Sequence, residues 1–313
     1  MCGIAGFLST DREVATGTTQ RMTESLAHRG PDDSGCHTVR FGSHWLGLGH
    51  RRLSILDLSP NGHQPMIDPE RGNVLIFNGE IYNFAALRRR LEHEGAQFRG
   101  TGDSEVLLSA LGRWGVEATL KRLEGMYAFA FFNPGEETLS LARDPLGIKP
   151  LYLAMKDHVG LAFASEVRGV LKSGLVDRKL NRNGVAGFLA FGAVQHPFTL
   201  FEDVRSLTPG SYRQIRAHSS GWSAGTERRF WNFPELRENV EETGVVEAIR
   251  EGVDRAVHDH LVSDVPVGVL LSAGLDSTVI AAAAGRRSER LTCFTVGFSD
   301  NTDLSEAPVA ART

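Results

Sequence analysis

The chain opens with the stretch Met1-Cys2-Gly3-Ile4-Ala5-Gly6-Phe7. The apolar run 3–8 is typical of a short buried strand. Residue 2 has a small side chain, so we expect removal of the initiator methionine, which makes Cys2 the N-terminal residue. Its α-amine, with a reference pKa of roughly 7.7–8.0, then lies beside a thiol whose pKa starts near 8.5. Cys2 can therefore supply a nucleophile and its own base, although a small packing residue is the ordinary alternative.

The composition is that of a soluble globular protein. The 313 residues are 41% hydrophobic and 23% charged and include 34 glycines, which argues against a disordered, collagenous or membrane chain. This length predicts about two domains. The net charge of −4 gives no field that would favour nucleic acid or anionic lipid, so we expect neither as a partner.

Cysteine usage and the N-terminal segment predict a cytoplasmic protein. The three cysteines, Cys2, Cys36 and Cys293, are too few and odd in number for a disulfide framework. No charged segment precedes an apolar run at the N-terminus, and no apolar run approaches the roughly 20 residues of a membrane helix.

Residues 1–216 mix strand and helix signals in the manner of an α+β domain. Asn83 and Asp103 each precede a helical pattern and can cap it. The pair Asn78-Gly79 follows an apolar run and is a strong hairpin signal. The predicted helices are 19–27, 84–94 and 104–111, and the predicted strands are 45–50, 74–77, 126–133, 138–143, 150–155 and 161–165.

Residues 217–239 are polar and rich in residues that break helices and strands, so we expect a linker or domain edge there. A different pattern follows in residues 240–313, which the sequence divides into a helix (246–261), a strand (265–271), a polar turn (272–277), a helix (278–284) and a strand (291–298). That order predicts a parallel βαβ unit. So few elements cannot cover both faces of a parallel sheet, and we expect this second domain to be incomplete in the chain.

Four residues could complete a site around Cys2. A nucleophile that attacks an amide needs donors for the oxyanion, and the side chain of Asn78 with the backbone of Gly79 can provide them. Arg52 can bind the α-carboxylate of an amino acid and Asp103 its α-ammonium. A hairpin turn, a solvated arginine and a helix N-cap are the alternatives. The turn would be compatible with the oxyanion role, and spacing alone leaves the other interpretations open.

The segment Ser272-Ala273-Gly274-Leu275-Asp276-Ser277 lies between a predicted strand and a predicted helix. Backbone N–H groups at a helix N-terminus, together with serine hydroxyls, favour phosphate binding. The segment lacks the Gly-Lys-Ser/Thr ending of a Walker A loop. A plain strand-to-helix turn stays open as the alternative.

The order of these motifs resembles that of glutamine-dependent asparagine synthetases of the bacterial type and their amidotransferase relatives. The first part is similar to class II glutamine amidotransferases, which implies an N-terminal-nucleophile hydrolase with a four-layer αββα architecture. The second part is similar to the start of an ATP pyrophosphatase-type synthetase domain, which implies an α/β fold. The matching segments are 1–7, 28–32, 52–55, 77–83, 101–105, 125–129, 143–152, 164–166 and 263–277.

The resemblance implies a role for each matching residue. Cys2 would be the nucleophile, with Asn78 and Gly79 as the oxyanion hole. The glutamine site would comprise Arg52, Leu53, Ser54, Asn78, Gly79, Glu80 and Asp103, and the ATP site Leu271, Ser272, Gly274, Asp276, Ser277 and Val296. Ala273 stands where many asparagine synthetases have glycine, which weakens the assignment of the acceptor more than that of ATP.

These roles imply a ligase with two coupled sites. Cys2 would hydrolyse glutamine, and the ammonia would aminate a carboxylate that ATP has adenylated, with release of AMP and pyrophosphate. Aspartate is the favoured acceptor and Mg²⁺ is expected with ATP, whereas no motif fixes a metal and no tightly bound cofactor is expected. Two alternatives remain: a related amidotransferase acting on a saccharide, peptide or secondary-metabolite carboxylate, and a non-catalytic glutamine-binding module. A homodimer is compatible with each of these interpretations.

Overall fold

The computed structural model describes residues 1–313 except 157–158, 236–243, 288–289, 299–304 and 313. It divides into two compact units, Met1–Phe233 and Pro234–Thr313, which are described separately. Among the described residues, no helix is both long and apolar enough to cross a membrane.

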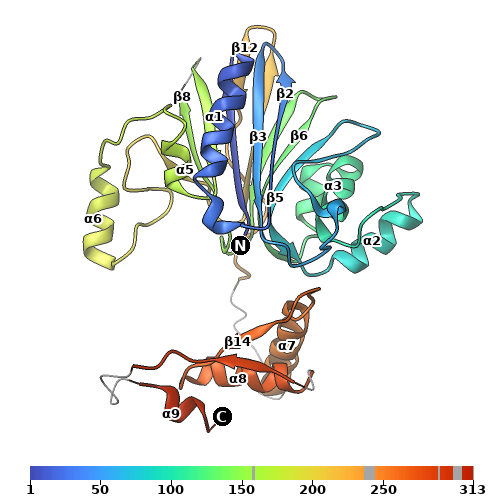
Figure 1. The fold of residues 1–313 in the computed structure, drawn as a ribbon, viewed down its shortest axis with the longest axis vertical. Helices are drawn as coiled ribbons and strands as arrows, with labels where there is room; N and C mark the ends of the chain where they lie inside the picture. The colour runs from blue at the N-terminus through green and yellow to red at the C-terminus, as the bar shows by residue number, and fades with distance from the viewer. Residues whose placement is uncertain (157–158, 236–243, 288–289, 299–304, 313) are drawn as a thin grey trace. The chain divides into compact units, whose positions relative to one another are not determined.

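Two antiparallel sheets form the centre of the first unit (Figure 1). The first sheet contains β1 (Gly3–Ser9), β2 (Asp33–Phe41), β3 (His44–Arg52), β8 (Tyr152–Lys156), β9 (Gly160–Ala164) and β10 (Arg205–Ser206). The second contains β4 (Met66–Ile67), β5 (Val74–Ile81), β6 (Gly125–Asn133), β7 (Thr138–Arg143), β11 (Ser211–His218), β12 (Gly221–Ala224) and β13 (Arg228–Arg229). Their strand orders are β10-β8-β9-β1-β3-β2 and β12-β11-β7-β6-β5-β4, with β13 paired to β11.

Helices cover the outer face of each sheet. The helices are α1 (Arg12–Glu24), α2 (Phe84–His93), α3 (Asp103–Trp114), α4 (Val116–Leu120), α5 (Val167–Leu171) and α6 (Arg182–Phe191). Met22 of α1 and Val170 of α5 pack on the first sheet. Leu87 of α2 and Leu107 of α3 pack on the second, and a separate apolar cluster fills the space between the sheets. The expected αββα architecture is thereby confirmed.

The layer between the two sheets changes from apolar to polar along its strands. Side chains alternate across a strand, so every second residue of β1, β3 and β5 points into this layer. Buried side chains such as Leu8, Leu48 and Ile76 fill its middle. Toward one end the same alternation continues with Cys2, His50, Arg52, Asn78 and Glu80. The strand pattern therefore collects polar groups at one end of an apolar core.

The hairpin predicted at Asn78-Gly79 is wrong, because both residues lie inside β5 (Val74–Ile81). β5 pairs with β6 throughout, with Gly79 opposite Tyr127. Glycine permits this approach: a Cβ at position 79 would lie 2.3 Å from Met126 O and 2.7 Å from Tyr127 Cα. Strand pairing has overridden a local turn signal.

The polar stretch 217–239 adds strands to the second sheet as far as it is described. β12 pairs with the end of β11, with His218 opposite Gly221, and β13 pairs with the start of β11. The first unit ends at Phe233, within this stretch.

In the second unit, β14 (Gly268–Leu270) and β15 (Thr292–Phe294) are parallel strands. α8 (Leu275–Gly285) connects them, α7 (Val245–His260) precedes them, and α9 (Ala307–Ala310) follows them. This order confirms the predicted βαβ unit. Val269 and Ala281 belong to a small buried cluster, whereas Leu270 and Val296 are 80% and 73% exposed. All three residues of β15 are exposed, so within the described residues Val269 is the one strand residue of this small sheet that is buried.

We expect Gly79→Ala to lower the melting temperature of the protein. The added methyl group would meet the backbone of β6, and relief of that clash should cost about 1–3 kcal/mol. Gly17→Ala in α1 is the control, because a Cβ there meets first only Arg21 Nη1, at 3.6 Å, and alanine is favoured in a helix by roughly 0.5–1 kcal/mol. Scanning calorimetry of the two variants measures the difference. Equal melting temperatures would contradict the close packing of β5 on β6.

Candidate active site

A pocket opens at the polar end of the layer between the sheets. The space within it, together with the open solvent at its mouth, is about 540 Å³. It brings together the predicted residues Cys2, Arg52, Leu53, Asn78, Gly79, Glu80 and Asp103, and is also lined by Met1, Ile55, Leu56, Gln64, Phe77, Ser104 and Lys149. Ser54 does not line the pocket, and its backbone N–H donates to Asp32 Oδ2 at 2.8 Å.

Strand register places the Cys2 thiol in this pocket. Ile4 of β1 lies opposite His50 of β3. Two residues earlier, Cys2 is therefore level with Arg52. The backbone N–H of Leu53 donates to Cys2 Sγ at 3.4 Å. Burial raises the pKa of the Cys2 thiol above its usual value, so the thiol is protonated near neutral pH and needs a base to become a nucleophile.

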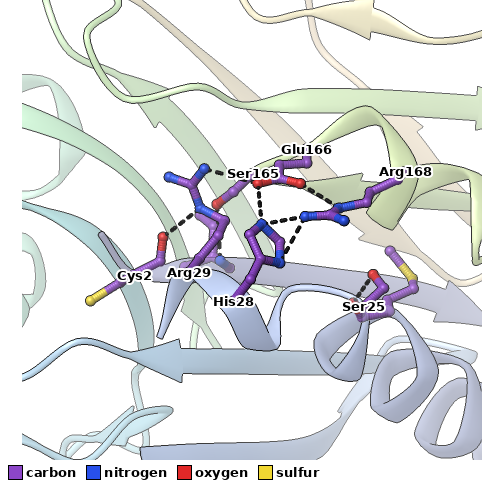
Figure 2. A network of polar contacts seen from close by, with 9 residues as sticks. Cys2, Ser25, His28, Arg29, Ser165, Glu166 and Arg168 are labelled. Atoms are coloured by element: carbon purple, nitrogen blue, oxygen red, sulfur yellow. Dashed lines mark hydrogen bonds and ion pairs between the residues drawn. The ribbon is translucent and has the colours of Figure 1, made fainter. Parts of the chain in front are cut away.

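A charged network fixes the backbone of Cys2 (Figure 2). Arg29 Nε donates to Cys2 O at 2.9 Å, and Arg29 Nη1 donates to Glu166 Oε1 at 3.0 Å. The same carboxylate contacts His28 Nε2 at 2.8 Å and Arg168 Nε at 2.6 Å. Burial alone would raise the pKa of Glu166, but the hydrogen bonds from His28, Arg29 and Arg168 together lower it. Glu166 therefore stays ionised and holds Arg29 against the Cys2 carbonyl.

Asn78 and Gly79 present donors toward the pocket from β5. The Asn78 side chain is 1% exposed, and its Nδ2 has no hydrogen-bond partner among the described residues. Along an antiparallel strand, successive N–H groups point to opposite edges. Those of Phe77 and Ile81 bond side chains rather than β6, so the N–H of Gly79, midway between them, faces the same edge. Leaving a buried amide unpaired is costly, and two adjacent donors of this kind suit an oxyanion.

Arg52 supplies positive charge to the pocket. Its guanidinium is buried, and its Nη groups donate to the backbone carbonyls of Leu56, Asp57 and Ser59. Gly62 makes room for it, since a Cβ there would lie 1.9 Å from Arg52 Nη2. A guanidinium has five N–H donors. The donors that these carbonyls leave over, on Nε and Nη1, are suited to a carboxylate.

Asp103 supplies the opposite charge. It is the first residue of α3, but the N-cap is Gly102, so the capping role that the sequence allowed for Asp103 is wrong. Its Oδ2 instead accepts the backbone N–H of Ile81 at 2.9 Å. Burial raises the pKa of Asp103 to about 6, and the charge of Glu80 adds to this shift. A carboxylate ionised at such a cost is suited to pairing with a cation such as an α-ammonium group.

Two buried polar residues of the pocket, Lys149 and Gln64, received no role from the sequence. Lys149 is buried, and burial lowers its pKa, whereas the negative charge of Glu80, and that of Cys2 when it is a thiolate, oppose that change. Its positive charge near the thiol favours the thiolate that forms during attack. Gln64 is also buried. A single lysine or glutamine in a loop carries no recognisable sequence pattern, so only the fold reveals these positions.

The predicted phosphate loop connects β14 to α8 in the second unit. The hydroxyl oxygens of Ser272 and Ser277 are 2.8 Å apart, and Ser272 Oγ accepts the N–H of Gly274 at 3.1 Å. Gly274 is the N-cap of α8 and makes no side-chain capping bond, which leaves first-turn N–H groups for an anion. The N–H of Ala273 donates to Glu306 Oε2 at 3.4 Å, so a phosphate group would compete with that carboxylate.

Of the other predicted ATP residues, Leu271 and Val296 follow β14 and β15, and Asp276 lies in the first turn of α8. The N–H of Leu271 donates to Phe294 O at 2.9 Å, while Val296 and Asp276 are exposed. Hydroxyl and backbone donors fit phosphate, and the Asp276 carboxylate fits Mg²⁺ bound to it. In the part of the chain that the structure describes, no group of three or more His, Cys, Asp or Glu could hold a metal ion alone.

The arrangement of nucleophile, oxyanion donors and charged clamps defines a candidate amidotransferase site on an N-terminal-nucleophile fold. The family model described as the glutamine amidotransferase domain matches residues 1–231. The chain therefore belongs to the glutamine amidotransferase domain family. A second model, described as asparagine synthase, matches residues 248–313.

Curated relatives share both parts of the chain. Asparagine synthetase (glutamine-hydrolyzing) 1 of Bacillus subtilis is 36% identical over 320 residues, which cover 100% of this chain and 48% of the relative. A putative glutamine-hydrolyzing asparagine synthetase of Mycobacterium tuberculosis is 37% identical over 330 residues, covering 99% and 49%. Amidase chry2 of Gibberella zeae is 30% identical over 344 residues, covering 100% and 49%. The chain thus spans about half the length of these relatives.

A solved structure supports the fold. Glutamine phosphoribosylpyrophosphate amidotransferase from B. subtilis, complexed with ADP and GMP, aligns with a TM-score of 0.52 and 19% identity over 94% of this chain and 65% of that chain. At this identity the likeness shows the fold alone.

We expect glutamine binding to weaken as Asp103 is protonated. In a Cys2→Ala background, which separates binding from turnover, the Kd for glutamine should rise about tenfold per pH unit below about 6, where the carboxylate becomes neutral. Calorimetric titration between pH 4.5 and 8 measures this. Asp103→Asn in the same background should bind weakly at every pH. Persistence of the pH dependence in that variant would contradict the assignment.

Asp103→Asn should also make the protein more stable at neutral pH. The folded pKa of about 6 lies above that of an unfolded aspartate. Burial of the charge therefore lowers the free energy of unfolding as the pH rises from about 4 to about 6, and this loss remains at higher pH. The substitution removes a cost of up to about 3 kcal/mol. Its melting temperature should exceed that of the parent at pH 7.5 and approach it at pH 4. A constant difference across this range would show that the charge is not the cause.

Proposed function

We propose that the first unit hydrolyses glutamine with Cys2 as the nucleophile. The observation that carries this proposal is the pocket itself, where the Cys2 thiol meets the donors of Asn78 and Gly79 and the opposite charges of Arg52 and Asp103. Arg52 would bind the α-carboxylate and Asp103 the α-ammonium group of the substrate. These two contacts orient an amino acid so that its side-chain amide faces the thiol.

The reaction begins when the α-amine of Cys2, freed by removal of Met1, takes the proton of the thiol. The sulfur attacks the amide carbon of glutamine, and the N–H groups of Asn78 and Gly79 stabilise the oxyanion. The amine gives a proton to the leaving nitrogen, so ammonia departs and a γ-glutamyl thioester remains on Cys2. Water then attacks the thioester, which releases glutamate and restores the thiol. One glutamine and one water give one glutamate and one ammonia.

We propose that the whole protein uses this ammonia in a ligase reaction. The Ser272 and Ser277 hydroxyls and the N-terminal N–H groups of α8 would hold the phosphates of ATP, with Leu271 and Val296 nearby. Mg²⁺, when bound to ATP, neutralises phosphate charge. A carboxylate displaces pyrophosphate from ATP to give an acyl-adenylate, and ammonia then displaces AMP to give the amide.

Aspartate is the acceptor that we favour, because two of the relatives above are named asparagine synthetases and match both parts of the chain. A different small carboxylate is the second candidate. One relative of similar coverage is named an amidase, and Ala273 occupies the phosphate loop where the resemblance led us to expect glycine. The three cysteines are all free thiols, which supports placement in the reducing cytoplasm.

Cys2→Ala should abolish glutamine hydrolysis and glutamine-dependent amide synthesis in the full-length protein. Synthesis from added ammonia should remain within about twofold, since the substitution removes only the nucleophile. Cys36→Ala is the matched control, because Cys36 is a free cysteine that does not line the pocket. Glutamate release and amide formation are measured separately. Glutamine hydrolysis by Cys2→Ala at the parental rate would contradict the assignment.

The acceptor can be identified from AMP formation. The full-length protein, supplied with ATP, Mg²⁺ and ammonia, should release AMP fastest with aspartate when it is compared with a panel of saccharide, peptide and amino-acid carboxylates. Mass spectrometry of the product identifies the amide. A faster rate with another carboxylate would overturn the aspartate assignment and leave that of Cys2 intact.

A further inference from the structure

Phe77, the residue before Asn78, has both of its backbone polar groups held by side chains. Its N–H donates to Gln64 Oε1 at 2.6 Å, and its carbonyl oxygen lies 3.0 Å from His50 Nε2. These groups point away from β6, because Phe77 has the same parity as Ile81 in the β5–β6 register. β4 pairs with β5 only at Val74 and Leu75. Side chains therefore replace a neighbouring strand along the part of the β5 edge that leads to the oxyanion donors.

The nitrogen of the Gln64 side-chain amide is directed to Ser104, which also lines the pocket. Gln64 Nε2 donates to Ser104 Oγ at 3.4 Å, and Ser104 Oγ donates to Asp103 Oδ1 at 3.4 Å. The donor and acceptor roles are consistent along this path, because an amide nitrogen can only donate and an ionised carboxylate can only accept. Both bonds are long and weak. The short bond to Phe77 is therefore the principal contact of Gln64.

His50 acts as a neutral donor. It is fully buried, and burial lowers its pKa to about 4. A carbonyl oxygen can only accept, so the proton of the neutral ring lies on Nε2 and is donated to Phe77 O. Within the described residues, Nδ1 of the same ring has no hydrogen-bond partner. The single bond to Phe77 is thus the polar contact that this buried ring makes.

We propose that Gln64 and His50 are positioning residues. By hydrogen bonding to the N–H and the carbonyl oxygen of Phe77, they orient the oxyanion donors of Asn78 and Gly79. This inference rests on the proposed glutaminase function. These two hydrogen bonds matter because an oxyanion hole works through donors that are fixed before the reaction. A displacement of a few tenths of an ångström weakens the hydrogen bonds that those donors make to the oxyanion. Among the described residues no strand pairs with this edge at Phe77, so Gln64 and His50 supply the restraint directly beside Asn78.

Gln64→Met removes the acceptor for the Phe77 N–H while preserving the length of the side chain. We expect kcat for glutamine hydrolysis to fall about 10- to 100-fold, which is less than the loss of a whole oxyanion donor. The affinity for the product glutamate should change less than about threefold, because glutamate has no amide oxyanion. Gln214→Met is the matched control: Gln214 is a partly buried glutamine outside the pocket that donates to Ser140 Oγ at 3.4 Å.

Two further measurements distinguish misoriented oxyanion donors from a misfolded active site. The aldehyde analogue of glutamine adds the Cys2 S–H bond across its carbonyl group, forming a hemithioacetal whose oxygen occupies the oxyanion position. Its affinity should fall in Gln64→Met by the same factor as kcat/KM. Alkylation of Cys2 by iodoacetamide should keep its parental rate within about twofold. Because Cys36 and Cys293 are also free thiols, mass spectrometry of the N-terminal peptide follows Cys2 alone, and its end point counts intact sites so that kcat is expressed per site.

The His50 variants keep the test decisive where Gln64→Met fails to fold. His50→Gln can still donate to Phe77 O and should retain kcat within about fivefold, whereas His50→Leu cannot donate and should lose about 10- to 100-fold. Parental kcat per intact site and parental aldehyde affinity in Gln64→Met, or in His50→Leu where that variant is used, would overturn the inference while the glutaminase assignment stands. Absence of glutamine hydrolysis by the full-length parent would instead overturn the proposed function.

Discussion

The pairing of β1 with β3 is the constraint on which the site depends. It sets Cys2 level with Arg52, and alternation then turns both side chains into the layer that also receives Asn78. A slip by one residue would turn these groups toward α1. The outer face of β3 opposes such a slip, because a Cβ at Gly47 or Gly49 would lie 2.1 Å or 2.0 Å from a threonine hydroxyl of α1. The close fit of α1 on glycine thus fixes which way the active-site residues point.

The chemistry of the pocket opposes its stability. Asp103 and Lys149 are buried ionisable groups. Asn78 and His50 each leave a buried polar atom unpaired among the described residues. Each such group costs free energy that a folded chain avoids elsewhere. The fold supports them by placing them at the end of the apolar layer between the two sheets. The packing of the same strands in the apolar core therefore offsets the free-energy cost of the buried polar groups at the site.

The sequence predicted the residues that meet in the pocket, and the strands with long apolar runs, better than it predicted helix bounds and local geometry. The helix expected at 19–27 is α1 (Arg12–Glu24), and α6 (Arg182–Phe191) was not predicted. Apolar runs and their alternation identified β6 and β7, because such patterns report burial directly. Asn78-Gly79 was wrongly expected to form a turn, since pairing with β6 is a long-range effect that a dipeptide cannot reveal. Asp103 proved to bond Ile81 rather than cap its helix. Lys149 and Gln64 were missed because their importance lies in what the fold places beside them.

Burial favours the neutral form of both members of the nucleophilic pair, the thiol and the α-amine. It raises the pKa of the Cys2 thiol, and it lowers the pKa of the α-amine at Met1, which shares the pocket. If the amine of Cys2 meets the same surroundings after methionine removal, both shifts favour a neutral thiol with a neutral amine over a thiolate with an ammonium ion. Charge then separates only as sulfur attacks, when the oxyanion donors and the positive charges of Arg52 and Lys149 stabilise the negative charge that moves onto the substrate. A nucleophile held neutral in this way is also less reactive toward oxidants and alkylating agents, because their target is the thiolate. The surroundings that make the thiol a poor nucleophile at rest thus restrict its reactivity to a carbonyl group that the pocket has already aligned.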